Sequence, residues 1–147
     1  MPYKTEWYIE GQVVYAEIWG VQALEELHRS NSEMLRYLNS VDGRLVHVIM
    51  NDEKLVKVPV SLMQMQKVLT YAKHPQLGWV TMFGDKEKSV KMAAEDIIMS
   101  LLARITRAHY IRFKTFDEAV RHLKSVDETI RWEAVNPEHK SQSTSGT

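Results

Sequence analysis

The chain has 147 residues, 44% of them hydrophobic and 26% charged, which is the size and composition of one globular domain. Its 19 basic and 19 acidic residues give a formal net charge of zero, so no overall field draws it to nucleic acid or anionic lipid. It contains no cysteine, which excludes disulfides, thiolate metal sites and a cysteine nucleophile.

The first third of the chain predicts a hairpin, a helix and a buried strand. Strand-like runs cover residues 7–10 and 13–19, and Gly11 between them can supply the positive φ of a tight turn. Apolar residues then recur at helical spacing over residues 21–38. The run LVHVIM, residues 45–50, is typical of a strand buried on both faces, in which a histidine needs partners for its ring nitrogens.

The rest of the chain alternates helices and strands. The predicted elements are a helix over 62–72, a strand over 77–83, a helix over 93–105, a strand over 109–113 and a helix from 115. His74-Pro75 ends the first of these helices, because a residue before proline avoids the helical region. Thr115, three residues before Glu118, predicts a capping box at the last helix.

This order, ββαβαβαβα, predicts a single α/β domain over residues 1–132. Alternating strands and helices favour a mostly parallel sheet, here with an antiparallel first strand and about four helices. From Glu133 the chain runs EAVNPEHKSQSTSGT, which has almost nothing to bury. Residues 133–147 are therefore expected to form a flexible C-terminal tail.

The opening hairpin, the buried third strand and a serine at the start of the second helix resemble the STAS domain of anti-sigma-factor antagonists. That group, often called SpoIIAA-like, is structurally akin to the CRAL-TRIO lipid-binding fold. The resemblance covers about residues 5–130 and rests on element order and apolar pattern. In the family, an Asp-Ser pair opens the second helix and the serine is phosphorylated by a partner kinase. Here Val60-Ser61 stands at that place, followed by Leu62 and Met63 instead of the usual glycine.

The resemblance implies a non-enzymatic regulatory or protein-interaction module that works through the loop 51–60 and the start of the second helix. A phosphate on Ser61 would meet free backbone amides and nearby lysines, although Asp52 and Glu53 would repel it. Ser61 followed by Gln64 is also a capping box worth about 1 kcal/mol, and we favour this simpler role. The candidate switch or interaction residues are Ser61, Asp52, Lys54, Lys57, Leu62 and Met63.

Met63 falls off the inward spacing of the second helix and is expected to be exposed, as at an interface. The alternative function is binding of a lipid or small apolar ligand, in a pocket lined by Trp79, Met82 and Phe83. Basic and aromatic residues alternate over 104–114, but a core and sheet-edge role is favoured over nucleic-acid binding.

No catalytic set is visible. The six histidines are scattered without metal-ligand spacing, adjacent carboxylates do not converge, and no nucleophile elbow or phosphate loop occurs. We therefore expect no enzyme activity, metal or cofactor, but a protein partner whose identity stays open. The absence of a signal-like segment or of roughly 20 consecutive apolar residues predicts a cytoplasmic protein. It is expected to be a monomer, or a weak homodimer through the second helix or the first strand.

Overall fold

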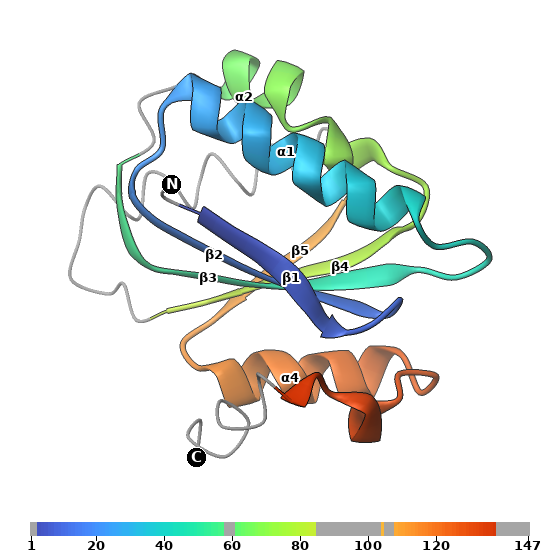
Figure 1. Ribbon diagram of the computed structural model, residues 1–147. Coiled ribbons are helices and arrows are strands. Elements are labelled where there is room, and N and C mark those ends of the chain that lie inside the picture. Colours follow the sequence, from blue (N-terminus) through green and yellow to red (C-terminus); the bar gives the residue numbers. More distant parts are fainter. Residues whose placement is uncertain (1–2, 58–60, 85–103, 105–107, 138–147) are drawn as a thin grey trace.

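The computed structural model describes residues 3–57, 61–84, 104 and 108–137. A five-stranded sheet carries α1 and α2 on one face and α4 on the other (Figure 1). The strands are β1 Tyr3–Ile9, β2 Val13–Val21, β3 Val46–Lys57, β4 Leu77–Phe83 and β5 His109–Phe113. The helices are α1 Leu24–Asn39, α2 Leu62–Val68 and α4 Phe116–Val126, with short 3₁₀ helices η1 Thr70–Lys73 and η2 Trp132–Ala134. Within these ranges, no helix is long and apolar enough to cross a membrane.

The sheet has the strand order β1-β2-β3-β4-β5, in which β1 and β2 are antiparallel and the later pairs are parallel. Gly11 has a φ of +75° in the turn between β1 and β2, and the Gln12 N–H donates to the Ile9 carbonyl at 2.9 Å. A positive φ costs glycine little, so this residue allows the tight connection. The predicted hairpin and mostly parallel sheet are confirmed.

Two apolar layers hold the helices to the sheet, and the central strands β2 and β3 supply both. Successive residues of β2, such as Val14 and Tyr15, face opposite layers, as the two-residue repeat of a strand requires. In β3, Val48 belongs to the layer under α1 and α2, whereas Ile49 belongs to the layer over α4. The prediction that residues 45–50 lie in a strand buried on both faces is thus confirmed, although Leu45 itself is exposed and precedes the strand.

The helices follow the predicted segments with several differences. The first helix, predicted over residues 21–38, begins at Leu24, because Val21 belongs to β2. The predicted second helix is divided into α2 and η1, because Leu69 between them has φ −86° and ψ 62°, outside the helical region. At α4 the Thr115 Oγ1 accepts the Glu118 N–H at 3.2 Å, but the Glu118 carboxylate accepts from the Thr115 hydroxyl instead of its N–H. The helix predicted over 93–105 lies outside the described residues apart from Arg104, so three α-helices are described where about four are predicted.

The chain remains attached to the sheet beyond residue 132. Val135 forms a β-bridge with Ile9, and the Asn136 N–H donates to the Tyr8 carbonyl at 2.8 Å. Residues 135 and 136 thus contact β1, and the domain boundary after residue 132 stays a prediction. These contacts use backbone groups, which the polar composition of the segment does not reveal. Residues 138–147 of the predicted tail lie outside the described part of the chain.

Candidate interaction surface at the strand ends

The segment predicted as a loop is largely strand. β3 continues to Lys57, so residues 51–57 belong to the sheet, and residues 58–60 lie outside the described residues. This part of β3 pairs with β2, where Trp19 lies opposite Lys54 and Val21 opposite Lys57. Acids and lysines interrupt the apolar pattern here, but backbone pairing to a neighbouring strand tolerates polar side chains. The prediction of a loop over these residues is wrong.

Ser61 begins α2 as a helix cap. Its Oγ accepts the Gln64 N–H at 3.2 Å, and its own N–H donates to Gln64 Oε1 at 3.0 Å. The predicted capping box is confirmed. Ser61 is exposed, so the cap leaves the hydroxyl accessible. Its modification, or its contact with a ligand, stays a prediction.

Asp52 is buried in the sheet, where only 2% of its surface is exposed. Its carboxylate accepts two hydrogen bonds from the Arg112 guanidinium on β5, one of them from Nη1 to Oδ1 at 3.0 Å. This ion pair spans β4, which lies between the two strands. Asp52 therefore stabilises the sheet interior and is not the loop residue that the sequence predicts. Lys54 is exposed, while the side chains of Lys57 and Leu62 lie outside the description.

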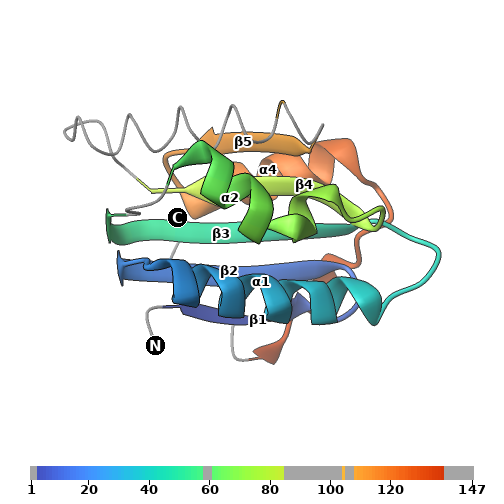
Figure 2. The ribbon, with the colours of Figure 1, turned by 90° about the horizontal axis from the view of Figure 1, so that it is seen from above.

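Four exposed apolar residues lie where β2 and β3 end and where α1 and α2 begin. Val21 and Val56 are 52% and 59% exposed near the ends of these paired strands, and Leu24 and Met63 are 38% and 67% exposed in the first turns of the helices. Both helices start at this end of the sheet (Figure 2). We call these four residues the strand-end surface. The predicted exposure of Met63 is confirmed.

The three residues of the predicted apolar pocket do not share a face of the sheet. Met82 packs in the layer under α1 and α2, whereas Trp79 and Phe83 pack on the side of α4. Alternation along β4 separates them, because residues 79 and 83 point one way and residue 82 the other. The Trp79 ring stacks on His109 at a centroid distance of 4.8 Å, and the Phe83 ring lies 5.5 Å from Phe116. Lipid or apolar-ligand binding gains no support from this arrangement.

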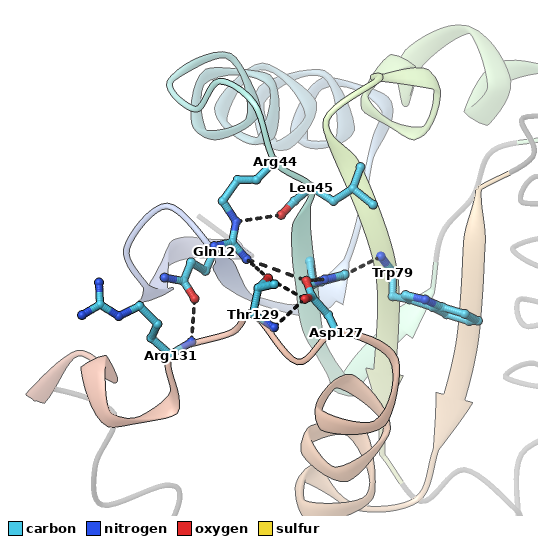
Figure 3. Close-up of polar contacts among 8 residues, drawn as sticks. Gln12, Arg44, Leu45, Trp79, Asp127, Thr129 and Arg131 are labelled. Atoms are coloured by element: carbon cyan, nitrogen blue, oxygen red, sulfur yellow. Dashed lines mark hydrogen bonds and ion pairs between the residues drawn. The ribbon is translucent and has the colours of Figure 1, made fainter.

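His47 of β3 lies in a buried polar cluster that the sequence reveals only in part. Its Nδ1 accepts the Trp79 N–H at 2.9 Å, so its proton is on Nε2, which donates to Asp127 Oδ2 at 2.8 Å. Thr129 donates its N–H and its hydroxyl to Asp127, and the Arg44 Nη2 lies 3.7 Å from the same carboxylate (Figure 3). The prediction that the histidine of this strand needs partners is confirmed, and only 2% of its surface is exposed.

These contacts stabilise one protonation state of each residue. Burial alone would raise the pKa of Asp127, but hydrogen bonds from Thr129 and His47 outweigh it and lower the pKa to about 2. Burial lowers the pKa of His47, although its hydrogen bond to Asp127 opposes that shift. Both ring nitrogens of His47 are occupied, and the hydrogen bond from His47 to Asp127 joins β3 to the end of α4. In the described ranges, no group of three or more metal-ligating side chains occurs.

Comparison with known proteins gives the class of fold. No protein-family model matches the chain, and no curated protein matches it. It is similar to the solved structure of an uncharacterised DUF3478-family protein with a SpoIIAA-like fold from Shewanella loihica PV-4. The identity is 11%, the match covers 82% of this chain and 91% of the other, and the TM-score is 0.59.

A second solved structure is that of the anti-sigma factor antagonist SpoIIAA in its unphosphorylated form. Here the identity is 11%, the coverage is 84% of this chain and 99% of SpoIIAA, and the TM-score is 0.53. The chain therefore has a STAS-like, SpoIIAA-like α/β fold, which confirms the resemblance found in the sequence.

Proposed function

We propose that this protein is a non-enzymatic regulatory module that binds a protein partner through the strand-end surface. The observation that carries the proposal is the gathering of Val21, Leu24, Val56 and Met63 at one end of the fold. Exposed apolar side chains at one end of a fold gain from being covered by another protein. The carboxyl ends of parallel strands are also the place where open α/β sheets usually bind their ligands.

The fold supports the same proposal by analogy. SpoIIAA, which shares it, is an anti-sigma factor antagonist. A fold can host many functions, so the surface carries more weight than the analogy. The surface also differs from the predicted one. Its strand part comes from the end of β3 and not from a loop, and Asp52 is removed from it by burial.

Substitution of the strand-end surface is expected to abolish partner binding without unfolding the protein. The test variant is Val56→Ser/Met63→Ser, and the matched control is Leu45→Ser/Val126→Ser, which changes two exposed apolar residues elsewhere on the protein. Tagged proteins are used to capture partners from cells that naturally produce the chain. A partner retained by wild type and control but lost by the test variant supports the proposal. Capture of the same proteins by wild type and both variants, or of none by wild type, contradicts it.

Ser61 is proposed as the point at which binding is regulated, since it caps the helix that presents Met63. Ser61→Ala is expected to lower the free energy of unfolding by about 1 kcal/mol, whereas Ser61→Asn, another good cap, is expected to lose less. Native and intact-mass spectrometry of protein purified from its own host tests the switch. A phosphate present on wild type and absent from Ser61→Ala supports it, and an unmodified wild type leaves Ser61 as a cap alone.

A further inference from the structure

The outer edge of β1 is a second surface at which a strand can pair. β1 is the terminal strand of the described sheet, so one side of its backbone pairs with β2 and the other faces outward. The Tyr37 hydroxyl donates to the Thr5 carbonyl at 3.0 Å, which indicates that this carbonyl points away from β2. In an antiparallel ladder the N–H and C=O of one residue point the same way, so Thr5 presents both groups outward.

We propose that this edge pairs with the β1 edge of a second copy of the chain, antiparallel about a two-fold axis at Thr5. In that register Thr5 lies opposite Thr5, Tyr3 opposite Trp7, and Lys4 opposite Glu6. The backbone N–H and C=O groups of residues 3, 5 and 7 all point away from β2, so they meet the same groups of the second strand. A two-fold interface uses the same patch on both copies, which suits pairing of a strand with itself.

The charges on β1 favour this register. The Lys4 Nζ and Glu6 Oε1 already lie 3.2 Å apart within one chain, on the same face of the strand. Two-fold pairing places each lysine directly across from the partner's acid, twice per dimer, and opposite charges at such positions stabilise strand pairs. The formal net charge of zero means that two copies do not repel each other.

The C-terminal segment limits how much of the edge is available. Val135 bridges Ile9, the Asn136 N–H donates to the Tyr8 carbonyl at 2.8 Å, and the Asn136 Nδ2 lies 3.5 Å from the Trp7 carbonyl. The pairing edge is therefore the stretch Tyr3–Trp7. Dimer formation replaces the long Asn136 side-chain contact, and the Thr5 carbonyl, which has two lone pairs, accepts from the partner strand beside the Tyr37 hydroxyl. Because so short a ladder adds few hydrogen bonds, the dimer exchanges with monomer.

Sedimentation velocity of the full chain over a concentration series tests the proposal, with a concentration-dependent dimer as the expected result. Lys4→Glu creates two like-charge pairs and is expected to weaken the dimer about tenfold. Lys4→Glu/Glu6→Lys restores opposite charges and is expected to recover wild-type association. Thr5→Pro removes an outward N–H, a change that edge strands tolerate, and is expected to abolish the dimer.

Met63→Ser on the strand-end surface is the control and is expected to leave the dimer unchanged, so this proposal and the proposed function fail separately. Circular dichroism verifies that each variant is folded. If Thr5→Pro does not fold, the charge reversal and its rescue still decide the outcome. A wild type that stays monomeric over the whole concentration series overturns the proposal. A dimer dissociation constant that is the same in wild type and Lys4→Glu overturns it as well.

Discussion

Asp52→Ala is expected to lower the free energy of unfolding by about 3–5 kcal/mol, the usual cost of removing one member of a buried ion pair. Asp52 is 2% exposed, and its carboxylate accepts hydrogen bonds from both terminal nitrogens of the Arg112 guanidinium. The arginine side chain is itself only 18% exposed, so water does not readily replace the lost carboxylate. The substitution also removes the link that joins β3 to β5 across β4.

Urea unfolding of wild type and variant measures this loss. Glu53→Ala is the matched control, because Glu53 is the next acid along β3 and is exposed, and its removal is expected to change stability by no more than about 0.5 kcal/mol. Asp52→Ala/Arg112→Met removes both charges and is expected to recover part of the loss. Equal stability of Asp52→Ala and Glu53→Ala would contradict the burial of this charge.

The predictions that succeeded rest on local patterns. Ser61 and Gln64 lie three residues apart and are bonded to each other, so their spacing alone predicts the capping box. The hairpin likewise follows from Gly11 between two strand-like runs. Met63 is exposed because it falls off the inward helical spacing, which the sequence also shows.

The features that the sequence does not reveal depend on partners far along the chain. Asp52 looks like a loop acid because its countercharge, Arg112, is 60 residues away on another strand. His47 is separated from Asp127 by 80 residues, so the sequence indicates only that its ring needs partners. Gly78 is part of the same arrangement, because a Cβ at that position would lie 2.4 Å from His47 Nδ1. Nothing in the run LGWVTMF indicates this steric limit.

The strand-end surface shows the same division. The exposure of Met63 is visible in the periodic pattern, whereas Leu24 keeps the spacing of a buried helix face and is nevertheless exposed. Val21 and Val56 reach the same end of the sheet only through the register that pairs Val21 with Lys57. The sequence favours a loop there, since charged residues hide the continuation of β3. The order of helices and strands is thus predictable from local apolar periodicity, whereas strand pairing decides which residues lie together on a surface.

Acidification is expected to destabilise the protein in two steps through the cluster of His47 and Asp127. The pKa of His47 in the folded protein lies below its ordinary 6.5, so below that pH the unfolded chain binds a proton that the folded protein does not, and stability falls. His122, whose pKa is also lowered by burial, acts in the same direction. The pKa of Asp127 falls from 3.8 to about 2, so its contribution is present above about pH 4 and is lost between about pH 4 and pH 2.

Asp127→Asn is expected to remove the second, more acidic step. An amide oxygen can still accept the Nε2–H of His47, but the charge that Thr129 and Arg44 stabilise is gone, so the variant is expected to be about 2 kcal/mol less stable at neutral pH. Urea unfolding at a series of acidic pH values gives the free energy of unfolding against pH for wild type and for Asp127→Asn. Glu128→Gln is the control at the neighbouring exposed acid. The curves of wild type and Asp127→Asn are expected to converge below the pKa of Asp127, because both side chains are then uncharged. Parallel curves down to that pH would mean that Asp127 contributes shape and hydrogen bonds but not charge.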